Sequence, residues 1–120
     1  MNSLLIVAHG SRRQASNDEV RALTDRIAGK TGKDFQHVQS AFLELAEPSI
    51  PAGIIQCIEN GATDITVLPY FLSAGRHVSE DIPNEVASVS DKYPDINIRI
   101  APYLGAMEHI ADLMIEQARK

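Results

Sequence analysis

The sequence has few of the features that mark secreted, membrane-spanning or nucleic-acid-binding proteins. Its 120 residues include no tryptophan and a single cysteine, and no apolar run is long enough to cross a membrane. Cys57 cannot form an internal disulfide and lies in an apolar stretch, so we expect a small, buried, structural residue. A net charge of −5 argues against a nucleic-acid partner, which would require a basic surface.

The first apolar run begins almost at the N-terminus, over residues 4–8. It lacks the basic start and the length of a secretory signal, so it predicts a buried strand and a cytoplasmic protein with no membrane partner. The composition, 44% hydrophobic and 22% charged, is that of an ordinary folded chain. At this length one modest core is expected, so residues 1–120 are predicted to form a single domain.

Apolar runs alternate with amphipathic stretches along the whole chain, a pattern that predicts βα units and a parallel sheet. The predicted fold class is α/β: a three-layer, flavodoxin-like open sheet of four parallel strands with helices on both faces. The third apolar run is rich in β-branched residues and ends at Pro69, so it is expected to lie in the centre of the sheet beside the first. The four strands are expected at residues 3–8, within 37–45, at 64–68 and at 97–101.

Four amphipathic stretches predict the helices. Ser16 and Glu19 have the spacing of a capping box, which places the start of the first helix at Ser16. The last helix, with Arg119 and Lys120 at its negative end, is expected to close the fold. The apolar residues expected to face the sheet are Val20, Leu23 and Ile27 in the first helix; Ile54, Ile55 and Ile58 in the second; Ile82, Val86 and Val89 in the third; and Met107, Ile110, Leu113 and Met114 in the fourth.

Ligands of open parallel sheets bind beyond the carboxyl ends of the strands, and the polar residues there form the candidate site. His9 follows the first strand, Glu44 ends the second, and His77 follows the third. Imidazole and carboxylate are good ligands for cobalt, nickel, iron and zinc. Two imidazoles leave coordination positions open, which suits an ion that is passed on rather than a structural zinc. The sequence therefore predicts a divalent-metal site at this edge.

Other charged residues and histidines allow two interpretations each. Glu47 could act in the site or only stabilise the start of the next helix. Arg12 and Arg13, just after His9, could pair with substrate carboxylates or be solvated loop charges, and their position favours the first. His37 and His109 are predicted to be structural or merely exposed, because one lies at the opposite end of a strand and the other on the last helix.

Three segments together resemble the small CbiX-type sirohydrochlorin cobaltochelatases, relatives of the ferrochelatases. They are LIVAHGSR at residues 5–12, AFLELAEPSI at 41–50 and VLPYFLSAGRHV at 67–78. The resemblance implies insertion of a divalent metal, most readily Co²⁺, into sirohydrochlorin without ATP, on the route to cobalamin or sirohaem. No permanent cofactor is implied, because the metal is a substrate.

The family pattern also implies roles for individual residues. His9 and His77 would be the metal ligands, and one of them would also accept pyrrole protons. Glu44 would support ligation or proton removal. Metal insertion releases two N–H protons, so a base near the held metal is required. The carboxylates of the anionic tetrapyrrole would be bound by Arg12, Arg13 and Arg76.

Members of this length resemble half of the longer chelatases, whose two similar domains enclose the substrate, and this implies a homodimer. Within the family, insertion of Fe²⁺ or Ni²⁺ is the alternative, and the lack of a histidine-rich loop favours cobalt or iron. A non-catalytic carrier of metal or tetrapyrrole is an alternative of another class. A third is a flavodoxin-like interaction domain with structural histidines.

Overall fold

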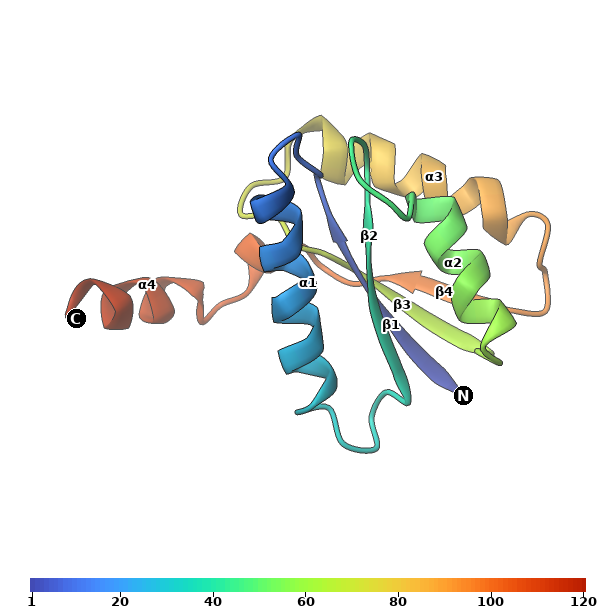
Figure 1. Ribbon diagram of the computed structural model, residues 1–120, viewed down its shortest axis with the longest axis horizontal. Helices are drawn as coiled ribbons and strands as arrows, with labels where there is room; N and C mark the ends of the chain where they lie inside the picture. Colours follow the sequence, from blue (N-terminus) through green and yellow to red (C-terminus); the bar gives the residue numbers. More distant parts are fainter.

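A computed structural model describes residues 1–120 and contains one sheet with helices on both faces (Figure 1). All strand pairs are parallel, in the order β2-β1-β3-β4. The strands are β1 (Asn2–Ala8), β2 (His37–Phe42), β3 (Asp64–Pro69) and β4 (Asn97–Ile100). The predicted α/β class is confirmed, and so is the central position of the third strand beside the first.

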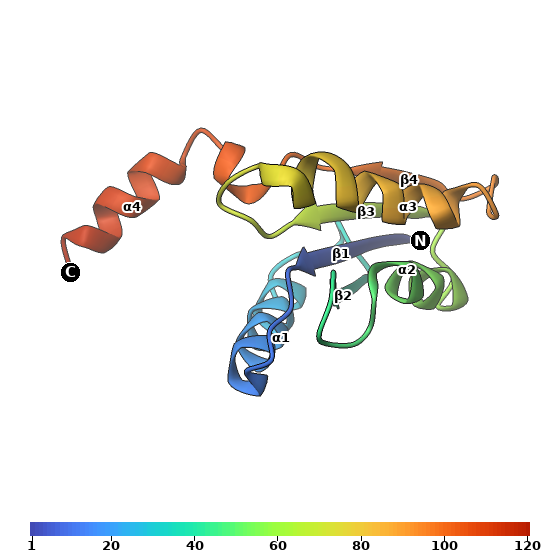
Figure 2. The same cartoon turned by 90° about the horizontal axis from the view of Figure 1, so that it is seen from above.

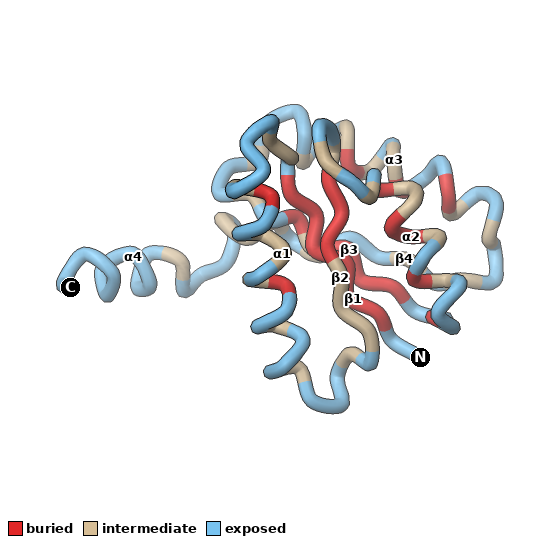
Figure 3. The backbone as a smooth tube through the Cα atoms, in the orientation of Figure 1, coloured by how far each residue is buried: buried red, intermediate tan, exposed pale blue.

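The main core lies between the sheet and two helices, α2 (Ile50–Glu59) and α3 (Ile82–Ser90). Alternate residues of β1 and β3 point into it, as the two-residue period of a strand requires, and the interiors of these strands are the most buried part of the chain (Figure 3). Cys57 is fully buried here, as expected, and burial raises the pKa of its thiol to about 11. The twelve core residues are Leu5, Val7, Ala41, Ile50, Ile54, Cys57, Ala62, Ile65, Val67, Ile82, Val86 and Val89.

Helix α3 carries its predicted apolar face, since Ile82, Val86 and Val89 are all buried. A π-helical turn, η1 (His77–Asp81), precedes it without a break. Such turns are rare and frequently occur at functional sites. In α2, Ile54 is buried as predicted, whereas Ile55 and Ile58 pack half-buried at the margin of the core.

The opposite face of the sheet is covered by α1 (Gln14–Ala28), and here the predicted capping box is wrong. The helix begins at Gln14 with Arg13 as its N-cap, and the Ser16 amide already donates to the Arg13 carbonyl at 3.0 Å. Ser16 therefore lies in the first helical turn rather than before it. The predicted apolar face, with Val20 and Leu23, is only half-buried.

The last helix, α4 (Ile110–Ala118), follows a short 3₁₀ turn, η2 (Leu104–Ala106). It forms where expected except that Met107 lies before it, but it does not close the fold. Figures 1 and 2 show it projecting away from the sheet, and no α4 residue is buried. The short, extended connection at Met107 directs the helix outward, which overrides the tendency of its apolar residues to pack on the sheet. No helix in the structure has the length and apolar character needed to span a membrane.

Candidate metal-binding site at the carboxyl edge of the sheet

The three predicted site residues meet at the carboxyl edge of the sheet. The His9 and His77 ring centroids are 4.7 Å apart with the rings tilted by 41°. The Nε2 atom of His9 lies 3.1 Å from Oε1 of Glu44. All three side chains are close to half exposed, so the edge is open to solvent. Residues from three separate loops are thus brought together, as the rule for parallel sheets predicted.

The His9–Glu44 pair continues the backbone ladder between β1 and β2. Beyond the last strand pair, the Leu43 amide donates to the Ala8 carbonyl at 3.0 Å and the Glu44 amide donates to the His9 carbonyl at 3.1 Å. Gly10 makes this approach possible, because a Cβ at that position would overlap the Glu44 carbonyl oxygen. Its φ of +93° also favours glycine. Backbone hydrogen bonds therefore position His9 against Glu44.

His77 is oriented by a residue that the sequence analysis did not select. Its Nδ1 atom is 2.7 Å from Oδ2 of Asp81, one turn further along η1. A carboxylate on one ring nitrogen fixes the tautomer of a histidine and makes the other nitrogen a better metal ligand. The Phe71 ring also lies near His77, with the two ring centroids 6.4 Å apart. The i,i+4 spacing of His77 and Asp81 is the feature of the sequence that could have indicated this contact.

In this arrangement each histidine contacts one carboxylate, His9 that of Glu44 and His77 that of Asp81. No three His, Cys, Asp or Glu side chains surround a common point in the geometry of a metal site. An ion entering between the imidazoles would displace the contact between His9 and Glu44 or recruit Glu44 as a further ligand, and it would leave the His77–Asp81 hydrogen bond in place. Oxygen and nitrogen donors of this kind suit divalent transition metals, and so few protein ligands would leave coordination positions open.

The three arginines predicted to bind the substrate lie in the connections that carry His9 and His77, after β1 and after β3. Arg12 and Arg13 are exposed in the loop between β1 and α1, and Arg13 serves as the N-cap of α1. Arg76 is 81% exposed and lies 3.6 Å from Glu80 on the next turn. None of these cations is buried, so all three are available to an anionic ligand. Glu47 is also exposed, and its backbone carbonyl, not its carboxylate, accepts a hydrogen bond from Arg21.

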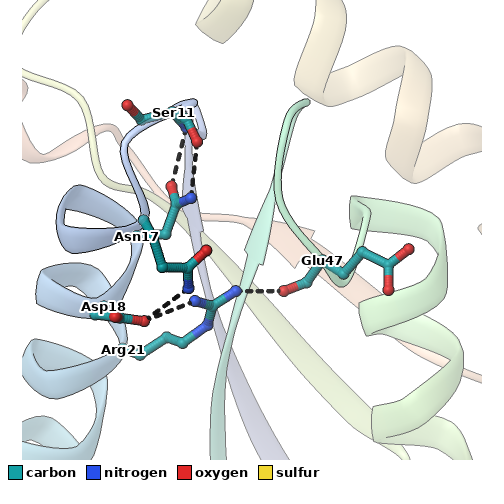
Figure 4. Close-up of polar contacts among 6 residues, drawn as sticks. Ser11, Asn17, Asp18, Arg21 and Glu47 are labelled. Carbon is teal, nitrogen blue, oxygen red and sulfur yellow. Dashed lines mark hydrogen bonds and ion pairs between the residues drawn. The ribbon is translucent and has the colours of Figure 1, made fainter.

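Two α1 residues that the sequence analysis missed hold the loops around the site (Figure 4). The buried Asn17 side chain accepts from the Ser11 amide at 2.9 Å and donates to the Ser11 carbonyl at 2.8 Å. Arg21 donates to Asp18 at 3.1 Å and to the Glu47 carbonyl at 2.9 Å. Apart from the i,i+3 spacing of Asp18 and Arg21, no sequence pattern signals these contacts, because the other partners are backbone groups of loops.

Arg21 also stacks on Phe42. Its guanidinium carbon lies 5.0 Å from the centre of the Phe42 ring, within the range of a cation–π interaction. Phe42 is fully buried at the end of β2, directly before the loop that carries Glu44. Arg21 thus joins α1 to both ends of the β2–α2 connection.

Two cavities open beside the histidines and share Leu43 and Glu44 in their walls. The smaller, of about 280 Å³, also contains the His77–Asp81 pair. The larger, of about 710 Å³, is formed by the loop at residues 43–49 and the first part of α2. Both are shallow and open to solvent, so the chain presents a one-sided surface rather than an enclosed pocket.

The two other histidines lie elsewhere. His37 begins β2 at the opposite edge of the sheet, and its Nε2 atom is hydrogen-bonded to Oε1 of Gln39 at 2.7 Å. His109 is the exposed N-cap of α4. Both positions agree with the structural or exposed roles that the sequence predicted for them.

An open parallel sheet with two histidines and a carboxylate beyond its strand ends defines an α/β protein with a candidate metal site at the carboxyl edge. Comparison with known proteins is consistent with this class. The family model of CbiX matches residues 3–120, and the chain belongs to the CbiX family.

The relatives with assigned activities include a ferrochelatase and a cobaltochelatase, and both are named for sirohydrochlorin. The chain is 36% identical over 117 residues to a sirohydrochlorin ferrochelatase of Priestia megaterium, which covers 98% of this chain but 43% of that protein. It is 33% identical over 120 residues to a sirohydrochlorin cobaltochelatase of Sulfolobus acidocaldarius, covering 100% of this chain and 92% of that protein. This chain thus spans less than half the length of the first relative and nearly all of the second.

The solved structure of the sirohydrochlorin chelatase SirB from Bacillus subtilis subspecies spizizenii, in complex with cobalt, has the same fold. It superposes with a TM-score of 0.87 at 30% identity, over 98% of this chain and 50% of that chain. The longer protein therefore contains this fold in about half of its length.

Proposed function

We propose that this chain inserts a divalent metal, most readily Co²⁺, into sirohydrochlorin or a closely related anionic tetrapyrrole, without ATP. The observation that supports this most directly is the meeting of His9, His77 and Glu44 at one open edge, with the imidazoles 4.7 Å apart. The activities named for the relatives fit the same chemistry. Residues 1–120 are taken as one domain, located in the cytoplasm as the sequence predicts.

The chemistry requires that a metal ion be delivered to the macrocycle while two pyrrole N–H protons leave. In the proposal His9 and His77 hold the ion on one face of the ring. As the metal–nitrogen bonds form, the protons pass to a histidine nitrogen or to Glu44 and then to solvent. Because the site is open, these groups exchange protons with water between turnovers. Arg12, Arg13 and Arg76 are proposed to bind the carboxylates of the substrate through charge-assisted hydrogen bonds.

A homodimer is part of the proposal. Cavities of 280 and 710 Å³ on one open edge enclose only one side of a macrocycle. The SirB structure uses twice the length of this chain for one protein. A second copy facing the first would supply the missing wall, and two-fold symmetric dimers are the commonest oligomers.

The metal is the open part of the proposal, and iron is the second candidate. The P. megaterium relative at 36% identity is a ferrochelatase, whereas the S. acidocaldarius relative of similar length is a cobaltochelatase. Imidazole and carboxylate accept Co²⁺, Fe²⁺ and Ni²⁺ alike, and selectivity commonly follows the availability of the metal.

The test is anaerobic metal insertion followed by the visible spectrum of sirohydrochlorin. We expect the protein to accelerate the spectral change with Co²⁺ over the uncatalysed rate, and His9→Ala or His77→Ala to lose that acceleration. His37→Ala and His109→Ala are the matched controls and should retain it. No acceleration with Co²⁺, Fe²⁺ or Ni²⁺ would disprove catalysis. Retention of the pigment on the protein would then identify a carrier.

A further inference from the structure

Leu45, in the connection between β2 and α2, combines an unfavourable backbone conformation with an exposed apolar side chain. Its φ is +64°, and it is the only residue other than glycine with a positive φ. A Cβ makes this left-handed conformation costly, so leucine rarely adopts it. The side chain is also 54% exposed. The stability of the free protein therefore gives no reason for a leucine at this position.

The backbone on both sides of Leu45 is fixed by the rest of the fold. Directly before it, the Glu44 amide donates to the His9 carbonyl at 3.1 Å. The Phe42 amide donates to the Pro48 carbonyl at 2.9 Å, and this hydrogen bond closes the connection into a loop. An unfavourable conformation persists only where its surroundings determine it in this way, and residues of this kind cluster at functional sites.

The left-handed turn directs the Leu45 side chain outward. Along an extended chain, side chains two residues apart point to the same side. Leu43 packs half-buried against the core, so an extended continuation would direct Leu45 toward the core as well. The positive φ ends this alternation, and the Leu45 side chain is exposed instead. The turn thus places an apolar group at the surface directly beside Glu44.

Leu45 borders the candidate metal site. The carboxylate of Glu44, its neighbour in the chain, lies 3.1 Å from the imidazole of His9. Leu45 lines the larger cavity of about 710 Å³, and Glu44 lines both this cavity and the smaller one of about 280 Å³ that contains His77. A flat ligand that extends from one cavity to the other would pass over Glu44 and meet Leu45.

We propose that Leu45 binds the tetrapyrrole substrate, with its side chain against the apolar face of the ring, and that this contact holds the ring over His9 and His77. The inference rests on the proposed function and adds a contact to it. A tetrapyrrole has a flat apolar ring with carboxylates at its periphery. The arginines proposed to bind those carboxylates leave the ring itself without a partner, and sites for such ligands combine apolar walls with a few charged groups.

This contact explains why an unfavourable residue is kept. Binding buries apolar surface of both the leucine and the ring, which favours the complex. Because the fixed backbone already holds the side chain outward, little further order has to be imposed when the substrate binds. Asparagine and glycine adopt a positive φ more readily than leucine does. Substitution of Leu45 by either should therefore leave the free protein no less stable while it weakens binding of the substrate.

The experiment compares full-length Leu45→Asn, Leu45→Gly and Leu45→Met with the wild type. Metal-free sirohydrochlorin is titrated anaerobically, and its absorbance gives the Kd. Initial rates of Co²⁺ insertion at varied sirohydrochlorin give KM and kcat, and urea unfolding gives the midpoint. Gly32→Leu is the matched control, because Gly32 has a similar φ of +58° with open space around it and lies outside both cavities.

We expect Leu45→Asn and Leu45→Gly to raise the Kd and KM about tenfold, the effect of removing one well-buried apolar contact. Because the contact is made equally to substrate and transition state, kcat should stay within about twofold. The urea midpoint should not fall. Leu45→Met should bind within about threefold of the wild type, since it keeps an apolar side chain of similar volume. Gly32→Leu should lower the urea midpoint and leave the Kd unchanged.

Three results would overturn the role of Leu45 and leave metal insertion standing. They are an unchanged Kd in Leu45→Asn, a loss in Leu45→Met as large as in Leu45→Asn, and a lower urea midpoint for Leu45→Asn. A wild-type protein that neither binds the pigment nor inserts metal would overturn both the proposed function and this contact. If the wild type binds the pigment without inserting metal, the proposed catalysis fails, and the comparison of Kd values alone decides whether Leu45 contacts the ring.

Discussion

Asp81 holds His77 by a hydrogen bond of 2.7 Å between its Oδ2 atom and the Nδ1 atom of the imidazole. The two residues are one helical turn apart on η1, so the local backbone maintains the contact without help from the rest of the fold. The bond leaves Nε2 as the free ring nitrogen of His77. A metal ligand held in this way needs little reorganisation before it binds.

Removing this carboxylate should weaken metal binding. We expect Asp81→Asn to lower the affinity for Co²⁺ by about 10- to 100-fold, because an amide neither fixes the same tautomer nor increases the basicity of the ring. Titration of the ligand-field absorbance of Co²⁺ measures this directly. Glu80→Gln, which alters the neighbouring carboxylate paired with Arg76, is the control and should bind as the wild type does. Equal affinities of Asp81→Asn and wild type would show that Asp81 does not support the ligand.

Gly10 should tolerate no side chain. Gly10→Ala would place a methyl group on the Glu44 carbonyl oxygen, so we expect it to destabilise the protein by about 3 kcal/mol or more in urea unfolding. Gly61→Ala is the matched control, because Gly61 has a nearly equal φ of +96° but open space around it. Gly61→Ala should cost only about 1–2 kcal/mol, which is the cost of placing a residue with a Cβ in a left-handed backbone conformation. Similar losses in both variants would mean that the close approach of the two loops is unimportant.

Arg21 should stabilise the loop that carries Glu44. We expect Arg21→Met to cost about 1–2 kcal/mol in urea unfolding, since it removes the hydrogen bond to the Glu47 carbonyl and the stacking on Phe42. The amide of Phe42, which donates to the Pro48 carbonyl, should exchange its hydrogen faster in this variant. Arg26→Met, in the last turn of the same helix, should change the free energy of unfolding by no more than about 0.5 kcal/mol. It should leave the exchange rate of the Phe42 amide unchanged.

Deprotonation of the Cys57 thiol should lower the free energy of unfolding in alkaline solution. Burial raises its thiol pKa from 9.0 to about 11, so the unfolded chain loses this proton at lower pH than the folded chain does. The contribution to stability is therefore complete below about pH 9 and decreases as the pH rises toward 11.

The measurement is the free energy of unfolding of the wild type and of Cys57→Ala between pH 8 and 11. Cys57→Ala should start less stable, because it leaves a cavity, but its stability should fall less steeply with pH. Parallel curves would show that the thiol does not titrate differently in the two states.

Much of the arrangement was predictable because it depends on periodicity and on one topological rule. Apolar runs predicted all four strands, and the helical spacing of apolar residues predicted the buried face of α3. The rule for parallel sheets brought His9, Glu44 and His77 to one edge, although 68 positions separate the histidines. The assignment of ligand and proton-transfer roles to these residues stays a prediction.

Other features were not predictable, for physical reasons specific to each. Asn17 binds the backbone of Ser11 in the preceding loop, and Arg21 binds the backbone of Glu47 in a loop 26 positions away; any residue type can supply such backbone groups. The Ser16–Glu19 capping box failed because Arg13 caps the helix and Ser16 lies within it. Apolar spacing indicated that α4 has a face to bury, but it carries no information on the direction in which the connection at residues 107–109 carries the helix.

The two sides of the site differ in how they are held. His9 and Glu44 continue the β1–β2 ladder, so backbone hydrogen bonds set their separation. His77 instead stands on a π-helical turn, at the end of an exposed connection of seven residues after β3. An ion between the imidazoles would meet one wall fixed by the β1–β2 ladder and one wall fixed by contacts within its own turn. If His9 and His77 hold the metal as proposed, ions of different radius would be accommodated by small movements of the His77 turn, and discrimination between metals would be left to their supply in the cell.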